Sequence, residues 1–468
     1  MKTWGQILLI LILATVIIVL VSENRHPVRT IAWILMLCLF PVVGLILYLV
    51  FGTDKRRSRL ITDEKLSLLK GKASSMYPEQ IMREIPDSHT DIASLLYMTN
   101  RAIPLGGNSV RVFTRCDEMF TSLIDDIRSA QDHVNFEFFK FEDDAVGRRF
   151  GEELIRKASE GVEVRVQYDS AVNLGRSNFY RWLRKNGVKV RAFLPVIVPF
   201  VSSNTNYRNH RKVVVIDGRI GYTGGMNIAE RYATGIRGGD WRDTHLRIEG
   251  PAVAEMQTAF AVDWSFSTKE FLDAERFYPK VDPCGGSIVQ IATSGPFDRW
   301  NVTMQGMMRI ITQARRYLYL ESPYLIPTEP VLAALRNAAL SGVDVRLILP
   351  YRGDRGVLVP LATRSYVEDA LEAGVKVFFY NGGYMHSKTI VADDTIATVG
   401  STNLDVRSFE QDFEMNAFLY DGDLACYLRD AFLTDQENSR PVDRKEWAGR
   451  SNFEKFRESF ARLFSPLL

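Results

Sequence analysis

Two copies of one short motif carry residue types suited to chemistry on a phosphodiester. The first copy opens with His210 and Lys212, and the second opens with His386 and Lys388. Both copies fit the pattern H-x-K-x4-D-x6-G-[GS]-x-N, and they begin 176 residues apart. A histidine can serve as nucleophile or general acid, and a lysine offers fixed positive charge to phosphoryl oxygens. Because the chain supplies each twice, we expect the two histidines to divide these roles.

The other positions of the motif form two further pairs. Asn227 and Asn403 follow small-residue turns that allow close backbone approach, and we expect them to reach the same pocket and bind phosphate. Asp217 and Asp393 belong to the candidate catalytic set by motif, but they lie at the far ends of the expected strands, beside turn residues. We expect their carboxylates to satisfy turn amides or a nearby cation rather than to act on the substrate.

The surroundings of each histidine predict how its ring is held. On a strand, side chains two residues apart point to the same face, so each histidine shares a face with its lysine. A nucleophilic histidine also needs an acceptor for its second ring nitrogen. Asp243 and Glu414 follow the two motifs at equivalent positions, and we expect them to orient the histidines. The alternative is that both are surface carboxylates.

The elements that must position these residues alternate between helix and strand. Residues 116–130 and 146–160 show helical spacing of apolar positions, whereas residues 134–141 and 162–168 are typical of strands. Similar segments recur in the second half, so the chain contains a domain duplication. Alternation of this kind indicates α/β halves with largely parallel sheets. We expect a pseudo-twofold arrangement in which both His-Lys pairs face the interface between the halves.

The N-terminal region predicts a transmembrane helical hairpin. Residues 4–21 and 31–51 contain no charged residue, and each approaches the roughly 20 residues that a membrane-spanning helix needs. A cleaved signal peptide is the alternative for the first span, but no small-residue cleavage site follows it. Basic residues gather at positions 55–59, after the second span, and they favour a cytoplasmic location for both ends of the hairpin.

These patterns predict the domain boundaries. We expect a hairpin over 1–53, a connector over 54–105, a first domain over 106–275 and a second domain over 285–468. The second domain ends in an amphipathic helix whose apolar positions are Phe453, Phe456, Phe460, Leu463, Phe464 and Leu467. We expect this stripe to pack against the globular body, with a membrane surface as the alternative.

An apolar insertion distinguishes the approach to the first motif from the approach to the second. Residues 194–201 are almost entirely apolar, and the second half has no counterpart to them before His386. The insertion either dips into a membrane and guides acyl chains, or packs as a buried edge strand. The sequence leaves both interpretations open.

The composition narrows the class of protein. With 468 residues, of which 46% are apolar, the chain can build more than one core. The formal net charge is only +2, so no global basic field points to a nucleic-acid partner. The four cysteines are scattered without metal-ligand or redox spacing, which is typical of unpaired thiols in a reducing compartment.

At these residues the sequence resembles the phospholipase D superfamily, and more narrowly the bacterial cardiolipin synthases. The resemblance rests on the paired motif, on residues 241–251 and 400–410, and on the apolar hairpin. It covers nearly the whole chain. It implies two duplicated phospholipase D-like α/β/α domains behind a multi-pass anchor in the bacterial cell (inner) membrane, with the catalytic domains in the cytoplasm.

The resemblance also implies a reaction that needs no metal or other cofactor. A phosphatidyl group would pass from one phosphatidylglycerol to another through a phosphatidyl-histidine intermediate, giving cardiolipin and glycerol. By analogy, His210 would be the nucleophile and His386 the acid and base. The two lysines and two asparagines would bind phosphoryl oxygens, and Asp243 and Glu414 would orient the rings. Phosphatidylethanolamine is an alternative donor.

Three rival functions remain at this stage. A phosphodiesterase or nuclease of the same superfamily would need clustered charge for nucleic acid, which the near-neutral balance and the two spans disfavour. A hydrolase of the phospholipase D type differs only in using water in place of a lipid hydroxyl, and no residue decides between them. A non-enzymatic scaffold is disfavoured because all four His and Lys positions are intact.

Overall fold

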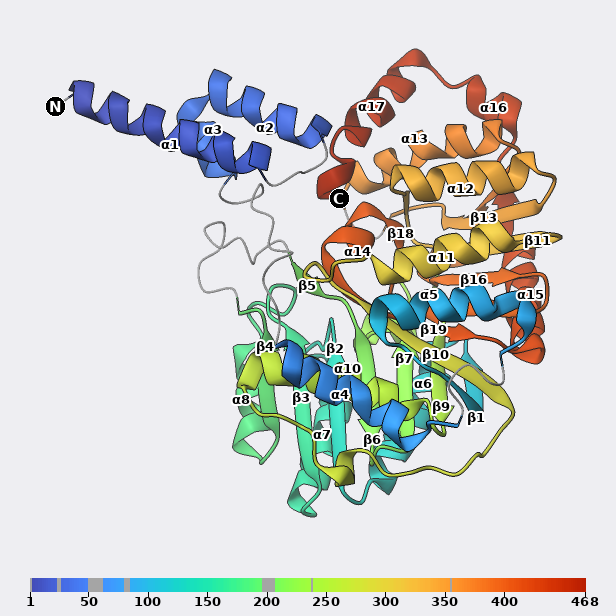
Figure 1. The fold of residues 1–468 in the computed structure, drawn as a ribbon. Coiled ribbons are helices and arrows are strands. Elements are labelled where there is room, and N and C mark those ends of the chain that lie inside the picture. The colour runs from blue at the N-terminus through green and yellow to red at the C-terminus, as the bar shows by residue number, and fades with distance from the viewer. Residues whose placement is uncertain are drawn as a thin grey trace. The chain divides into compact units, whose positions relative to one another are not determined.

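The computed structural model describes residues 2–22, 27–48, 62–79, 85–195, 207–236, 239–353 and 356–468 (Figure 1). The chain divides into two compact units. The N-terminal unit comprises residues 1–58 with 196–207, and the main unit comprises residues 59–195 with 208–468. Both copies of the motif lie in the main unit. Most of the apolar insertion predicted over 194–201 lies outside the described residues.

A proline divides the helices of the N-terminal unit. Its described residues form α1 (Lys2–Ser22), α2 (Pro27–Leu39) and α3 (Pro41–Leu47). The second apolar segment, expected over 31–51, is not one continuous helix in the described residues, because Pro41 lacks a backbone N–H and the helix is interrupted after Leu39. No helix in the described part of the chain combines the length and hydropathy expected of a membrane-spanning segment.

Apolar contacts hold the N-terminal unit together. Leu20 from α1 and Leu37 from α2 are buried in one small cluster with Tyr48. Gly44 lets α3 approach α2 closely, since a Cβ atom there would lie 2.7 Å from the carbonyl oxygen of Met36.

The first half of the main unit carries the first motif on short strands. The strands are β1 (Pro104–Phe113), β2 (His133–Phe138), β3 (Glu163–Asp169), β4 (Lys189–Phe193), β5 (Arg208–Asn209), β6 (Lys212–Ile216), β7 (Ile220–Gly224), β8 (Asp240–Arg242) and β9 (His245–Glu249). The helices are α4 (Asp63–Met76), η2 (Asp87–His89), α5 (Thr90–Asn100), α6 (Cys116–Ser129), α7 (Ala145–Ser159), α8 (Ser177–Lys185), α9 (Glu230–Thr234), α10 (Val253–Thr268) and η4 (Glu275–Phe277).

The second half repeats much of this order. Its strands are β10 (Ser287–Ser294), β11 (Tyr317–Glu321), β12 (Leu325–Ile326), β13 (Asp344–Pro350), β14 (Lys376–Tyr380), β15 (Gly383–Met385), β16 (Thr389–Ala392), β17 (Ile396–Gly400), β18 (Leu404–Asp405), β19 (Asp412–Leu419) and β20 (Ser439–Pro441). Its helices are α11 (Val302–Gln313), α12 (Glu329–Leu340), α13 (Leu358–Glu372), α14 (Val406–Glu410), α15 (Gly422–Glu437), α16 (Arg444–Ala448), α17 (Asn452–Arg462) and η5 (Ser465–Leu467).

One mixed sheet joins the two halves. Its order over the described residues is β20-β14-β13-β11-β16-β17-β19-β10-β1-β9-β7-β6-β2-β3-β4, and β5 also pairs with β19. Parallel pairs form the flanks, β2–β3–β4 and β11–β13–β14. The neighbours from β16 across to β6 are antiparallel. The duplication into α/β halves is confirmed, whereas the prediction of largely parallel sheets is wrong for the centre.

Tight turns after the two motif strands explain two of the antiparallel pairs, β6–β7 and β16–β17. Asp217 and Gly218 link β6 to β7 with φ values of 51° and 65°, and Asp393 and Asp394 link β16 to β17 with φ values of 56° and 60°. Two successive residues with positive φ are typical of hairpin turns, because their twist matches that of the strands. A strand joined to the next by so short a turn pairs with it antiparallel.

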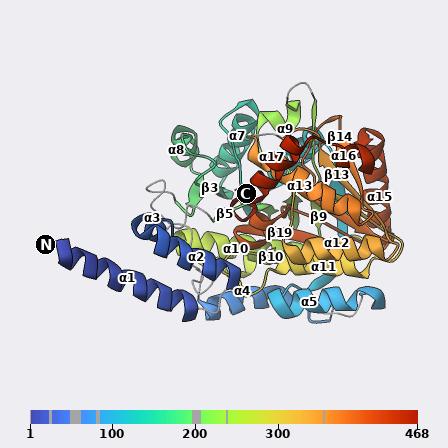
Figure 2. The ribbon, with the colours of Figure 1, turned by 90° about the horizontal axis from the view of Figure 1, so that it is seen from above.

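Helices cover both faces of the sheet. In the first half, α6, α7 and α8 share a core with the face of β6 that presents Val214 and Ile216. The opposite face presents Val213 and Val215 to a second core, which includes α4, α10 and α15 and draws on both halves. In the second half, α11 and α12 lie side by side and share a core with α13 (Figures 1 and 2). The motif strands are therefore buried from both sides.

Candidate active site

The two motif histidines are each fixed by the backbone of the opposite half. His210 joins β5 to β6, and its N–H donates to the carbonyl of Phe413 at 3.0 Å. His386 joins β15 to β16, and its N–H donates to the carbonyl of Arg242 at 2.7 Å. These bonds continue two short parallel pairings, β5 with β19 and β15 with β8. The structure thus brings both motifs to the interface between the sequence halves.

The orienting carboxylates cross between the halves. The Nδ1 atom of His210 lies 3.0 Å and 3.2 Å from the two carboxylate oxygens of Glu414. The Nδ1 atom of His386 lies 2.6 Å from Oδ2 of Asp243. Sequence order set Asp243 after the first histidine and Glu414 after the second, yet each carboxylate serves the histidine of the other half. Each ring therefore depends on both halves being assembled.

The aromatic surroundings of the two rings differ. His210 meets one aromatic ring edge-on, that of Phe139, at a centroid distance of 4.7 Å. His386 is flanked by Trp241 at 5.0 Å, Tyr384 at 5.8 Å and Tyr232 at 6.1 Å. The first histidine is thus held chiefly by its carboxylate, and the second by a carboxylate inside an aromatic wall.

Burial and charge set the protonation state around His210. Burial lowers the pKa of His210 to about 4, with Lys212 and Lys388 acting in the same direction and Glu414 opposing them. Burial alone would raise the pKa of Glu414, but His210, Lys212 and a hydroxyl donated by Ser401 outweigh it and lower that pKa. A neutral ring whose Nδ1–H faces an ionised carboxylate leaves the Nε2 lone pair available.

The effects on the pKa of Asp243, the carboxylate that contacts His386, have a different outcome. Burial raises the pKa of Asp243, although Lys388 and the backbone N–H of Thr244 act to lower it. That N–H donates to Oδ1 of Asp243 at 2.8 Å. The two buried carboxylates at the site are therefore shifted in opposite directions.

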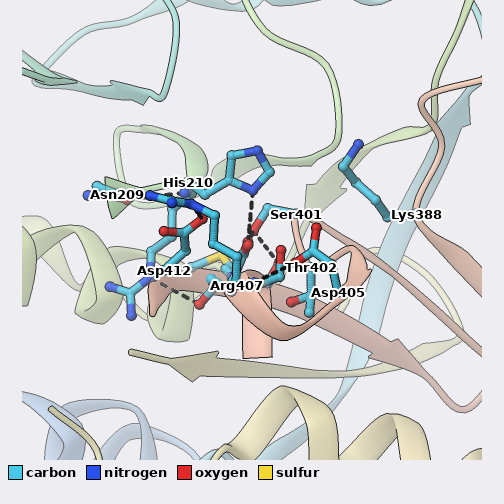
Figure 3. Close-up of polar contacts among 12 residues, drawn as sticks. Asn209, His210, Lys388, Ser401, Thr402, Asp405, Arg407 and Asp412 are labelled. Carbon is cyan, nitrogen blue, oxygen red and sulfur yellow. Dashed lines mark hydrogen bonds and ion pairs between the residues drawn. The ribbon is translucent and has the colours of Figure 1, made fainter. Parts of the chain in front are cut away.

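The two lysines lie with the histidines, as the strand spacing predicted. Lys212 donates from Nζ to the carbonyl of His210 at 2.5 Å. Lys388 lies with Nζ 3.0 Å from Nδ1 of His386 and also donates to the carbonyl of that residue. The pKa of Lys212 is lowered to about 7, chiefly by burial, with Glu414 opposing the shift and Lys388 contributing to it. Figure 3 shows Lys388 and His210 on either side of the loop that begins at Ser401.

The two motif asparagines are not equivalent. Asn227 accepts from the backbone N–H of Lys140 at 3.1 Å and donates to the hydroxyl of Tyr232 at 2.7 Å. Asn403 is buried, and its Oδ1 atom has no hydrogen-bond partner among the described residues. Of the two motif asparagines, Asn403 is therefore the one whose side-chain oxygen is unsatisfied among the described residues.

The motif aspartates lie away from the histidines. Asp217 accepts backbone N–H groups from residues 131–133, each at 2.8 Å, and Asp393 accepts those of residues 315–317 at 2.7 to 3.0 Å. Each is five residues beyond its lysine, which is roughly 16 Å along an extended strand. The structure therefore does not bring Asp217 and Asp393 to the catalytic cluster, and their contacts are those of turn-amide acceptors.

The second residue of the G-[GS] pair differs between the two motifs together with the carboxylate beside it. Glycine stands beside the aspartate, and serine stands beside the glutamate. At Gly225 an added Cβ would lie 2.0 Å from Oδ1 of Asp243, so only glycine leaves room for the aspartate. At the equivalent position Ser401 donates its hydroxyl to Glu414. Sequence reasoning missed this coupling, although the one difference between the two motifs at this position was its visible signal.

Two buried arginines next to the motif residues were also missed. Arg211 donates to Asp263 at 2.6 Å and to the carbonyl of Glu414 at 3.1 Å. Arg242 donates to Asp435 at 2.7 Å and to the carbonyl of Asp243 at 2.8 Å. Each arginine supports the backbone of an orienting carboxylate and is neutralised by an acid on a helix behind the sheet. Their positions directly beside a predicted site residue, Arg211 between His210 and Lys212 and Arg242 before Asp243, were the available signal.

A cavity of about 300 Å³ opens beside the strand that leads to His386. Its lining includes Tyr351, Arg352, Tyr380, Asn381 and Tyr384. The Tyr384 ring also contacts His386, so this cavity is continuous with the aromatic wall of the site. In the described part of the chain, no cluster of His, Cys, Asp and Glu side chains has the arrangement of a metal site.

Comparisons with known proteins agree with this geometry. The profile of the family described as "Cardiolipin synthase, PLD-like domain" matches residues 123–264 and 307–436, and the profile "Phospholipase_D-nuclease N-terminal" matches residues 7–52. A cardiolipin synthase of Listeria monocytogenes is 39% identical over 99% of this chain and 98% of its own length. One of Staphylococcus aureus is 39% identical over 99% of this chain and 96% of its own length.

A solved structure supports the fold independently. The crystal structure of phosphatidylserine synthase from Haemophilus influenzae superposes with a TM-score of 0.63 at 14% sequence identity. The match covers 81% of this chain and all of the other. At that identity the likeness extends to the duplicated fold alone.

Proposed function

The chain belongs to the cardiolipin synthase family with phospholipase D-like domains, and on that premise we propose how its site transfers a phosphatidyl group. The donor and the acceptor are both phosphatidylglycerol, and the products are cardiolipin and glycerol. The observation that carries the proposal is the crossed pairing of two buried histidines with two buried carboxylates. It supplies two imidazoles in one site, each with its second ring nitrogen already engaged.

In the first step, His210 is the nucleophile. Its Nε2 lone pair attacks the phosphorus of the donor lipid, and the bond from phosphorus to the head-group glycerol oxygen breaks. His386 enters protonated and gives that proton to the departing oxygen, so glycerol leaves as a neutral alcohol. The depressed pKa of His210 supports this assignment, because the ring is neutral across the physiological range.

In the second step, His386 acts as a base. Its neutral ring takes the proton of a head-group hydroxyl on the second phosphatidylglycerol, and that oxygen attacks phosphorus. The phosphorus–nitrogen bond breaks, His210 is restored, and cardiolipin leaves. Asp243 stabilises the imidazolium formed on His386 in this step, at the 2.6 Å contact with Nδ1.

The remaining motif residues serve the phosphoryl group. Lys212 and Lys388 offset the charge that develops on the phosphoryl oxygens, which is where preorganised donors act most strongly. We assign phosphate binding to the side-chain NH2 group of Asn403, because an amide N–H can donate to a phosphoryl oxygen. Both the oxygen and the nitrogen of the Asn227 amide already form hydrogen bonds, to Lys140 and Tyr232 respectively. We therefore assign Asn227 to positioning the loop that follows β7. Asp217 and Asp393 stabilise the motif hairpins.

We propose that the N-terminal unit anchors this chemistry at the bacterial cell membrane. Residues 4–21 and 31–51 lack charge, and the described segments α1 to α3 are predominantly apolar. We assign to them the anchoring of the enzyme at the bilayer that holds its substrate, with the main unit on the cytoplasmic side, where the basic residues at 55–59 favour it.

Product analysis tests the proposed reaction. Purified protein in detergent is incubated with labelled phosphatidylglycerol, and the lipid products are resolved for the wild type, His210→Ala and His386→Ala. The expected result is cardiolipin from the wild type and from neither variant. If the wild type produced phosphatidic acid instead of cardiolipin, the reaction would be hydrolysis and not transfer. Cardiolipin from both variants would refute the histidine mechanism.

A further inference from the structure

The C-terminal helix exposes its apolar face. Along α17 and η5 the large apolar side chains recur at helical spacing, and their exposed fractions are 69% for Phe453, 65% for Phe456, 50% for Phe460, 74% for Leu463 and 52% for Leu467. These five residues are the C-terminal stripe; Phe464, the sixth apolar position of the predicted stripe, is only partly exposed. The prediction that the stripe packs against the globular body is wrong, because the helix turns this face outward.

Specific contacts on the other face fix this orientation. The helix α17 packs on α13 and buries Glu458 and Ala461 (Figures 1 and 2). Glu458 accepts from Arg450 at 2.7 Å, and the hydroxyl of Tyr366 on α13 lies 3.1 Å from that of Ser465. The helix cannot rotate to bury the stripe without breaking a buried ion pair. Its outward apolar face is therefore a feature of the folded unit.

Reciprocal capping holds the start of the helix. Ser451 caps the N-terminus by accepting from the N–H of Glu454, and the Glu454 carboxylate accepts from the N–H of Ser451 in return. At the other end, Arg462 pairs with Asp369 of α13 at 2.7 Å. A helix anchored at both ends presents the stripe as a rigid surface.

The charge around the stripe is positive. Residues 439–468 contain seven arginines and lysines against four aspartates and glutamates. Three of the basic residues are paired: Arg450 with Glu458, Arg462 with Asp369 and Arg440 with Glu446. Arg444, Lys445 and Arg457 are exposed without a salt bridge among the described residues, and the exposed acidic residues of the segment are Asp443, Glu446 and Glu454. An apolar face bordered by basic residues is the composition of helices that lie in the interface of an anionic membrane.

The stripe lies close in the fold to the elements that carry the site. The turn η5, which ends the stripe, contacts α14, and Gln411 after α14 donates to the carbonyl of Pro466 at 2.9 Å. The helix α14 connects the loop of Ser401 and Asn403 to β19, which carries Glu414. A surface bound to the stripe would therefore sit near the half of the site that orients His210.

We propose that the C-terminal stripe is a membrane-docking surface, which inserts its phenylalanines and leucines into the head-group region of a bilayer rich in anionic phospholipid. The bordering arginines and lysines contact the lipid phosphates. Docking through this face holds the active site against the surface from which both lipid substrates come. The docking itself does not depend on the histidine chemistry, and only the link to substrate supply rests on the proposed function.

A bilayer suits this face better than a second copy of the chain. Two copies meeting through the stripe would bring two basic borders together, and like charges across an interface oppose association. An anionic lipid surface instead attracts the positively charged residues around the stripe. Large exposed apolar side chains also cluster here at one site, which marks an interaction surface rather than scattered surface residues.

Photo-crosslinking of the full chain tests the proposal. The protein is reconstituted in vesicles of phosphatidylcholine and phosphatidylglycerol that contain a phosphatidylglycerol with a diazirine in its acyl chain. After illumination, peptides carrying lipid adducts are identified by mass spectrometry. Adducts are expected within residues 452–468, and Phe456→Ser combined with Phe460→Ser should reduce them about tenfold. The control Leu340→Ser removes a 71% exposed apolar residue from α12 and should leave them unchanged.

Further readouts separate docking from catalysis and from folding. In a His210→Ala background the adducts should persist, because docking needs no turnover. The double variant should turn over vesicle lipid about tenfold more slowly while keeping its rate on a soluble short-chain phosphatidylglycerol and its melting temperature. Absent adducts at 452–468, or adducts equal in the double variant, would overturn the proposal. If the wild type were a dimer and the double variant a monomer, the stripe would bind a second copy of the chain, and the membrane proposal would be overturned.

Discussion

The surroundings of His210 and of His386 are built on the same plan and differ in the carboxylate that holds each ring and in the small residue beside that carboxylate. His210 faces a glutamate whose pKa is lowered, and a serine hydroxyl supports that carboxylate. His386 faces an aspartate whose pKa burial raises, with glycine at the serine position. In the proposed mechanism, these differences allow His210 to remain a neutral nucleophile while His386 exchanges a proton.

Removing either histidine should have the largest effect on turnover and should show whether the two histidines have different roles. With phosphatidylglycerol as substrate, His210→Ala and His386→Ala should each lose about ten-thousandfold or more in turnover, because each removes an obligatory group. With a phosphatidyl ester of nitrophenol, whose leaving group needs no proton, only His386→Ala should still release nitrophenol. Stopped-flow absorbance measures this release. Equal loss in both variants would contradict the division of roles.

Neutralising the orienting carboxylates should have the next largest effect. Glu414→Gln and Asp243→Asn should each slow transfer about a thousandfold, because an amide cannot stabilise the imidazolium or hold the required tautomer. On the nitrophenol ester the two should separate, with Glu414→Gln the slower, since Glu414 contacts the nucleophile. If Asp243→Asn were the slower of the two on that ester, the crossed assignment of roles would be wrong. Retained melting temperatures check that both variants fold.

Exchanging the small residues beside the carboxylates is a milder test. Gly225→Ser should reduce turnover about a hundredfold, because the new Cβ meets the Asp243 carboxylate at 2.0 Å. Ser401→Gly removes one hydrogen bond to Glu414 and should cost only about tenfold. Steady-state rates of the wild type and both variants measure the two losses of turnover. A harmless Gly225→Ser would show that Asp243 is free to move.

The smallest expected effect is in the pH profile. The neutral form of His210 is present above its pKa of about 4 and is lost as pH falls through that value. The charged form of Lys212 is present below its pKa of about 7 and is lost as pH rises through that value. For the nitrophenol ester, kcat/KM should therefore fall below about pH 4 and above about pH 7. An acid limb near the ordinary histidine pKa would contradict a buried, neutral His210.

The sequence predicted which residues form the site better than it predicted how they meet. Spacing alone identified the histidines, lysines and orienting carboxylates. The crossed pairing depends on β5 joining β19 and β8 joining β15, and pairings between segments so far apart leave no local pattern. The direction of the C-terminal stripe was equally hidden, because an amphipathic helix has the same spacing whether its apolar face meets a core or a membrane.

Other differences had local signals in the sequence. Pro41 interrupts the second apolar segment, and a proline within a helix removes a hydrogen bond. The pairs Asp217-Gly218 and Asp393-Asp394 are turn formers directly after the motif strands, and they indicate hairpins rather than parallel crossovers. The antiparallel pairs β6–β7 and β16–β17 could therefore have been predicted from these turns.

Trapping the covalent intermediate tests the division of labour most directly. Protein carrying His386→Ala is mixed with the nitrophenol ester bearing a labelled phosphatidyl group, quenched in alkali to preserve the phosphorus–nitrogen bond, and digested for mass spectrometry. The account predicts a phosphatidyl adduct on His210 in this variant and no adduct anywhere in His210→Ala. An adduct on His386 in His210→Ala, with none on His210 in His386→Ala, would contradict it.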